Sequence, residues 1–240
     1  MKFRLFGIKL SYEPKLVPSI ATFLGLAILL TLSGWQIHRL KWKENLISER
    51  INRFEGESSD LKNFKIPSNN EFRKVRINGK FLNDKEMFMP ALSKNGNNGF
   101  HILVPFSDEK ENLFIFDTGW VPSQKKSQPL RINNLDNSFS MKEAVIRLPG
   151  RKGKYQPDNE PNNNFWFFVD TAEMSKFTGL NFEKSFYLEA VNSGPNGFPL
   201  GSQTRIYIRN NHLQYAITWF LIACGLLGVY LTSSLSITKR

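Results

Sequence analysis

Aromatic and basic side chains gather at one end of each of the two longest apolar stretches of the sequence. His212, Tyr215 and Trp219 follow helical spacing and would share one face of a helix, and Trp35 and Arg39 repeat that spacing near the end of the first stretch. Aromatic faces can stack on a flat macrocycle, an imidazole can ligate its iron, and a guanidinium can pair with a propionate. These five residues are the candidate site for a heme-like ligand, with His212 as the metal ligand.

A plainer interpretation of the same residues is the one that their spacing alone favours. Tryptophan and tyrosine are enriched where a membrane meets water, and a long arginine side chain can extend toward lipid headgroups. The five residues would then anchor the chain and bind no ligand. His38 fits an interfacial histidine, and His101, within GFHILVPF, fits a side chain of a sheet.

The two apolar stretches are long enough to cross a bilayer. Val17 to Ile37 and Leu213 to Ile237 carry no charge, and about 20 apolar residues span the hydrocarbon core. The first stretch is too long for the apolar part of a signal peptide. Two spans put both termini on one side of the membrane. The expected organisation is a tail at 1–15, transmembrane helices at 16–37 and 213–237, an extramembrane domain at 38–212, and a tail at 238–240.

Short segments of strand character fill the region between the spans. They are separated by Asn, Gly, Pro and Asp turns, a pattern typical of a mostly β domain built as an antiparallel sheet or small barrel. Ser58 to Asn70 is expected to be a linker, and Thr171 is expected to cap a short helix that ends at Gly179. The predicted fold class is a membrane protein with two transmembrane helices flanking this α+β domain. The predicted strands are 73–81, 86–92, 100–106, 113–120, 144–148, 166–169 and 186–191.

Composition argues against nucleic-acid binding and against catalysis. The net charge is +11, but many basic residues flank the two spans, where lipid headgroups are the expected partner. The single cysteine, Cys224, lies within the second span and cannot form an intrachain disulfide. Asp117 and Asp170 are more typical of turns and caps than of an acid–base pair. Because no catalytic motif is present in the sequence, we expect a protein that is not an enzyme.

The sequence resembles the Surfeit locus protein 1 family of cytochrome c oxidase assembly factors over nearly its whole length. The resemblance rests on Gly34-Trp35-Gln36, on GFHILVPF at 99–106, on Gly119-Trp120-Val121-Pro122, and on the closing block from Asn211 to Phe220. One departure stands at Thr118, where the family usually has arginine. The missing arginine puts a polar contact near that turn in doubt, but not the fold.

The resemblance implies a function and a topology. The central domain would face the periplasm or the intermembrane space, and both termini the cytoplasm or the matrix. The protein would bind heme a, with His212 at the family's heme-associated histidine, and assist its insertion into oxidase subunit I, with heme a synthase as a further partner. The expected location is the bacterial inner membrane, as a multi-pass protein, or alternatively the mitochondrial inner membrane. The alternative function is a membrane-anchored scaffold that carries no heme.

Overall fold

A computed structural model of the chain describes residues 2–5, 8–61, 70–150 and 152–237. The chain folds into two compact units, Met1–Ser48 with Tyr207–Arg240, and Glu49–Ile206. The linker predicted from Ser58 to Asn70 falls mostly on residues 62–69, which lie outside the described ranges.

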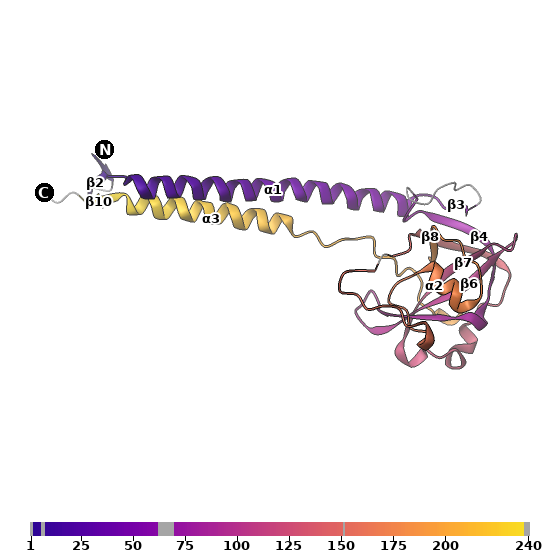
Figure 1. The fold of residues 1–240 in the computed structure, drawn as a ribbon. Coiled ribbons are helices and arrows are strands. Elements are labelled where there is room, and N and C mark those ends of the chain that lie inside the picture. The colour runs from indigo at the N-terminus through magenta and orange to yellow at the C-terminus, as the bar shows by residue number, and fades with distance from the viewer. Residues whose placement is uncertain (1, 6–7, 62–69, 151, 238–240) are drawn as a thin grey trace. The chain divides into compact units, whose positions relative to one another are not determined.

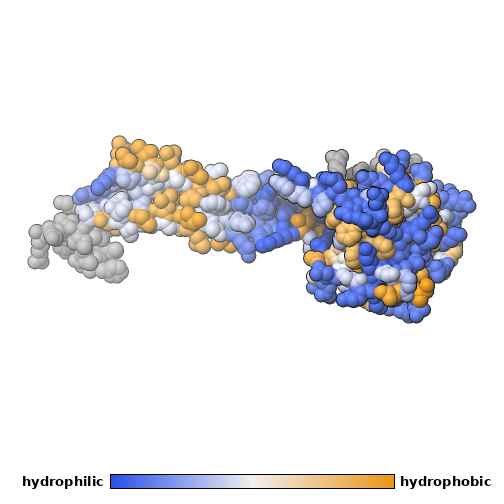
Figure 2. Space-filling model, turned by 60° about the horizontal axis from the view of Figure 1, so that its bottom comes forward, coloured by the Kyte–Doolittle hydropathy of each residue, from blue (hydrophilic) through white to orange (hydrophobic). Residues whose placement is uncertain are grey.

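The first unit contains two helices that run side by side in opposite directions, α1 (Leu16–Glu55) and α3 (His212–Ser233) (Figure 1). Both are long and apolar enough to cross a membrane. Their outward side chains are exposed, for example Phe23 at 71% and Leu221 at 62%, and Figure 2 shows hydrophobic residues over the helix pair. Exposed apolar surface of this extent fits contact with lipid. The two predicted membrane helices are confirmed, and α1 continues as a helix well beyond the apolar stretch, as expected.

Small and hydroxylic residues let the two helices approach each other. A Cβ atom on Gly25 would lie 2.9 Å from Leu226 Cδ2, so a larger residue there would require the Leu226 side chain to shift. The Ser33 hydroxyl donates to the Ala216 carbonyl oxygen at 3.0 Å, which links α1 to α3 by a hydrogen bond. Both Ser33 and Ala216 are buried. These contacts fix which residues of α1 lie opposite which residues of α3.

A small sheet that the sequence did not predict joins the two terminal segments. It is antiparallel, with β2 (Ile8–Tyr12) between β1 (Lys2–Leu5) and β10 (Leu235–Ile237). Because β10 pairs with β2, α3 ends at Ser233, four residues before the predicted end of the second apolar stretch. The Thr232 and Ser233 hydroxyls donate to carbonyl oxygens of the preceding turn, which helps to end the helix.

The second unit is a small β-barrel with two additional strands, each paired with one strand of the barrel. Five strands close on themselves in the order β4-β8-β9-β7-β6, because β6 also pairs with β4. All neighbouring pairs are antiparallel except β7–β9 and the short β3–β4 pair. The predicted choice between an antiparallel sheet and a small barrel is therefore decided for the barrel. The strands are β3 (Ser59–Asp60), β4 (Lys74–Phe81), β5 (Met87–Leu92), β6 (Asn98–Asp108), β7 (Leu113–Pro122), β8 (Ser140–Arg147) and β9 (Tyr187–Ala190).

Successive side chains of the barrel strands point alternately into and out of the barrel, and they form two separate hydrophobic clusters. Phe106 and Phe116 point into the barrel, where their ring centroids lie 5.3 Å apart. Leu103 and Ile115, on the same strands, point outward and pack against the fully buried Trp166. The helix α2 (Thr171–Thr178) covers this outer cluster through Met174. The barrel is thus filled inside by aromatic rings and covered on one outer face.

Two local predictions in this unit were wrong. No strand forms at 166–169; Phe165 makes an isolated bridge to Phe88, and the Trp166 indole donates to Asn164 Oδ1 at 2.9 Å. Trp166 and Val169 are instead buried in the outer cluster, and Phe167 and Phe168 are half-buried. Asp170 and not Thr171 caps α2, since its carboxylate accepts from the next two backbone N–H groups at 2.9 and 3.0 Å. Gly179 ends α2 as predicted, with φ of 72°.

Candidate functional site

The predicted ligand His212 lies at the first turn of α3 and contacts α1 through one polar residue. His212 Nδ1 lies 2.7 Å from Oε1 of Gln36, whose side chain is buried between the helices. Since an amide oxygen can only accept, Nδ1 carries the proton of this hydrogen bond. The neutral ring then has its lone pair on Nε2. Hydrogen bonding of one ring nitrogen commonly fixes the tautomer and direction of a metal-ligating histidine.

The predicted aromatic and basic partners lie on one flank of the helix pair. An α-helix turns about 100° per residue. On α1, Trp35 lies about 100° and Arg39 about 60° around the helix axis from Gln36, both in the same direction. On α3, Tyr215 lies about 60° around the axis from His212. In an antiparallel pair the same sense of rotation leads to the same flank. Because Gln36 lies opposite His212 and Ser33 opposite Ala216, Trp35 and Tyr215 also lie at nearly one level.

This flank is open to the surroundings. Trp35 is 53% exposed and Tyr215 54%, so their rings are available for stacking, while Trp219 is half-buried. Arg39 stacks on Trp42, with its guanidinium carbon 4.1 Å from the ring centroid. We call Trp35, Arg39, His212, Tyr215 and Trp219 the helix-pair site.

Histidine 38 is exposed and lies about 200° around α1 from Gln36, so it faces away from the pair. Among the described residues, no group of three or more His, Cys, Asp or Glu side chains could hold a metal ion. The described residues therefore offer no site at which protein side chains alone would hold a metal ion. A planar ligand that brings its own metal needs only one axial imidazole and flat apolar neighbours, and the helix-pair site fits that need.

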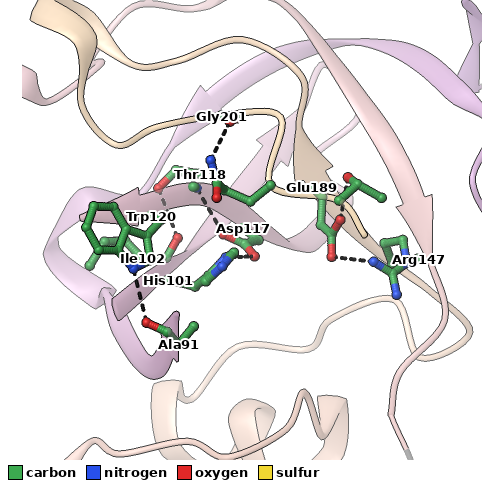
Figure 3. Close-up of polar contacts among 12 residues, drawn as sticks. Ala91, His101, Ile102, Asp117, Thr118, Trp120, Arg147, Glu189 and Gly201 are labelled. Carbon is green, nitrogen blue, oxygen red and sulfur yellow. Dashed lines mark hydrogen bonds and ion pairs between the residues drawn. The ribbon is translucent and has the colours of Figure 1, made fainter. Parts of the chain in front are cut away.

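A second polar cluster lies on the outer face of the barrel (Figure 3). His101 Nδ1 on β6 lies 2.6 Å from Asp117 Oδ2 on β7, and the backbone N–H of Gly119 donates to the other Asp117 oxygen at 2.9 Å. Gly119 has φ of 121°, and a Cβ there would lie 2.2 Å from the Leu200 carbonyl oxygen, so only glycine fits. The Gly119 backbone, within β7, thus holds the Asp117 carboxylate toward His101.

An ion pair on the neighbouring strands completes this cluster. Arg147 Nη1 donates to Glu189 Oε1 at 2.8 Å, and the hydroxyl of Thr204 donates to Glu189 Oε2 at 2.7 Å. Burial and the Glu189 carboxylate raise the pKa of Tyr187, whose hydroxyl therefore stays protonated and donates to Glu189. We call His101, Asp117, Arg147 and Glu189 the barrel-face cluster.

Opposing effects act on the charge of His101. Burial of the ring lowers its pKa, but the Asp117 carboxylate at hydrogen-bond distance, helped by Glu189, outweighs burial and raises the pKa above its ordinary value. Arg205 acts in the opposite direction. The imidazolium form is therefore favoured closer to neutral pH than in a free histidine.

Comparison with known proteins gives the family of the chain. The SURF1 family model matches residues 23–224. The chain belongs to the SURF1 family. It is 30% identical over 219 residues to a SURF1-like protein of Rickettsia bellii, covering 89% of each chain, and 30% identical over 206 residues to Surfeit locus protein 1 of Homo sapiens, covering 79% of this chain and 68% of the human one. A SURF1-like protein of Rickettsia felis is 29% identical over 227 residues.

The SURF1 family match spans both polar clusters. Together with the two apolar helices it identifies a membrane protein. Sequence reasoning singled out the helix-pair site but gave Gln36 no role, although an uncharged polar residue inside an apolar span needs a partner. It also treated His101 as a sheet residue and Asp117 as a turn residue. Asp117 is 2% exposed, and its burial could not be deduced before its partner strand was known.

Proposed function

We propose that this SURF1 family protein is a non-enzymatic assembly factor for cytochrome c oxidase that holds heme a transiently and assists its insertion into subunit I. The observation that carries the proposal is the hydrogen bond between Gln36 and His212, which leaves Nε2 as the unprotonated nitrogen of the neutral ring. The choice of cytochrome c oxidase as the partner and of heme a as the ligand rests on the sequence resemblance to the Surfeit locus protein 1 family.

The residues of the helix-pair site have distinct tasks in this proposal. His212 would ligate the heme iron, and Gln36 would hold the His212 ring in one tautomer. Trp35 and Tyr215 offer flat exposed faces on one flank at one level, and Arg39 offers a cation to a propionate. An open flank suits a cargo that must leave again, because a fully enclosed ligand would be released slowly.

The proposed setting follows from the same resemblance. The barrel would face the periplasm of a bacterium, and both termini the cytoplasm, with the protein in the inner membrane. The mitochondrial inner membrane is the alternative setting. Subunit I would receive the heme, and heme a synthase would supply it.

The test compares three forms of the full chain purified in detergent from cells that make heme a. We expect wild type to carry heme a in oxidised and reduced spectra, identified as the pyridine hemochrome, and His212→Ala to lose it. His38→Ala is the matched control, since His38 is an exposed histidine of α1 that faces away from α3. Heme retained by His212→Ala, or lost equally in His38→Ala, would overturn the assignment of His212.

A scaffold that carries no heme is the second candidate function. It is favoured by four exposed apolar side chains of the barrel unit, which a partner protein could cover. They are Leu130, Ile132, Phe139 and Met141, at 65%, 62%, 53% and 57% exposure. If purified wild type lacks heme but co-purifies with subunit I, this function replaces the first.

A further inference from the structure

The barrel-face cluster borders a pocket of about 350 Å³ on the outside of the barrel. His101 and Arg205 line it together with apolar side chains of β5, among them Met89 and Leu92. All of these residues belong to the barrel unit, and none of them is part of the helix-pair site. The pocket is far larger than the roughly 10–15 Å³ that a single water needs.

The acceptors of this pocket are already occupied. Each oxygen of Asp117 has a partner, in His101 and in the Gly119 N–H. Each oxygen of Glu189 also has a donor, from Arg147 and Tyr187 on one side and from Thr204 on the other. The carboxylates therefore have little capacity left for a cation or a donor from outside.

The donors of the same pocket are not used up. His101 directs Nδ1 to Asp117, so its Nε2 is left for a further partner, and it donates when the ring is protonated. The Arg205 side chain donates to the Leu92 carbonyl oxygen at 3.2 Å, which uses one of its five N–H groups. Arg205 is exposed. Its positive charge acts to lower the pKa of His101, because two like charges beside one pocket repel each other.

We propose that this pocket binds a small monocarboxylate, with His101 Nε2 and the Arg205 guanidinium as donors to its oxygens. An anion placed between the two cations relieves their repulsion and accepts hydrogen bonds that the saturated carboxylates of the chain cannot accept. The side chains of Met89 and Leu92 give a short apolar tail a place to pack. This site is independent of heme and would exist in either candidate function.

Binding would depend on pH through His101. The charged and titratable groups that border the pocket are Asp117 on β7, Arg147 on β8, Tyr187 and Glu189 on β9, and Arg205. Among these groups, His101 is the one that changes charge near neutral pH. Because the anion prefers the imidazolium, its affinity should fall about tenfold per pH unit once the pH exceeds the raised pKa of His101.

The experiment is a titration of the full chain in detergent, observed through histidine ring signals. The chain has three histidines, so the signal of His101 can be assigned with a His101→Gln variant. The probe is sodium butyrate at constant ionic strength, and its neutral match is butyramide. We expect a saturable shift of the His101 signal with butyrate, and an affinity for butyramide at least tenfold lower.

Two arginine variants separate a built site from general surface charge. Arg205→Gln should weaken butyrate binding at least tenfold, whereas Arg73→Gln removes an exposed arginine of the same unit that does not line the pocket and should leave binding unchanged. Equal shifts with butyrate, butyramide and chloride, or equal losses in the two variants, would overturn the proposal. Loss of heme from the helix-pair site would not affect this result, so the two proposals fail separately.

Discussion

Replacement of Gln36 by leucine tests how the helix pair prepares His212 for a ligand. The change introduces an apolar side chain of similar size and removes the acceptor that lies 2.7 Å from His212 Nδ1. A neutral hydrogen bond contributes about 1 kcal/mol, and leaving a buried donor unsatisfied costs about 1–3 kcal/mol. Loss of such an outer partner lowers metal affinity about 10–100-fold. We therefore expect Gln36→Leu to weaken heme binding about tenfold.

The assay is a titration of heme-free protein in detergent with ferric heme, followed by the Soret absorption. Ser33→Ala is the matched control, because it removes a hydrogen bond between the same two helices without touching His212. Gln36→Glu keeps an acceptor and should bind at least as tightly as wild type. If Gln36→Leu binds like wild type, or if Ser33→Ala weakens binding as much, the hydrogen bond does not prepare the ligand.

Three further predictions concern the barrel unit, whose unfolding in urea can be followed by tryptophan fluorescence, because Trp120 and Trp166 are both buried in it. Arg131→Met removes the partner of the buried Glu86 and should cost about 3–5 kcal/mol, while Glu86→Gln combined with Arg131→Met should recover much of this loss. The pKa of His101 is raised in the folded protein, so the stability that its charge contributes is complete below about pH 6.5, the ordinary pKa of histidine. This contribution should be lost as pH rises through the raised pKa of the folded protein. The free energies of unfolding of wild type and His101→Gln, measured against pH, would therefore converge at high pH. Asp170→Ala should cost about 1 kcal/mol through loss of the α2 cap, and an unchanged urea midpoint would contradict it.

Long periodic features were the ones that the sequence predicted well. The two apolar helices need no partner to be recognised, because their length and lack of charge reflect the thickness of a bilayer. Most strands of the barrel were also found, since turn residues separate them. Trp166 was misassigned because a run of aromatic residues fits a strand and a buried loop equally, and only the tertiary core distinguishes them.

Contacts between distant segments could not be predicted in the same way. Spacing alone placed His212, Tyr215 and Trp219 on one helix face, but the residue opposite His212 depends on how α1 and α3 align. Gln36 differs from its neighbours only by being polar. The same limit applies to His101 and Asp117, which lie 16 positions apart and meet because β6 and β7 pair with a register shift between His101 and Leu103.

The departure at Thr118 leads to a last prediction. The side chain of Thr118 lines a cavity of about 250 Å³ at one end of the barrel, and Glu86 and Arg131 line the same cavity. Arg131 pairs with one oxygen of Glu86, whereas Oε1 has no hydrogen-bond partner among the described residues. An arginine at position 118, as the family resemblance leads one to expect, would bring a second cation toward that oxygen. We therefore expect Arg131 to supply here the charge that position 118 lacks.

Thr118→Arg should therefore compensate for the loss of Arg131. We expect Arg131→Met alone to be strongly destabilising, and the double variant Thr118→Arg with Arg131→Met to recover about half of the loss or more, because residues that share a partner are not additive. Thr118→Val is the control, since it keeps the shape of threonine and adds no charge. If urea unfolding shows that the effects of Thr118→Arg and Arg131→Met simply add, the two positions do not share Glu86, and the departure at Thr118 has no counterpart in Arg131.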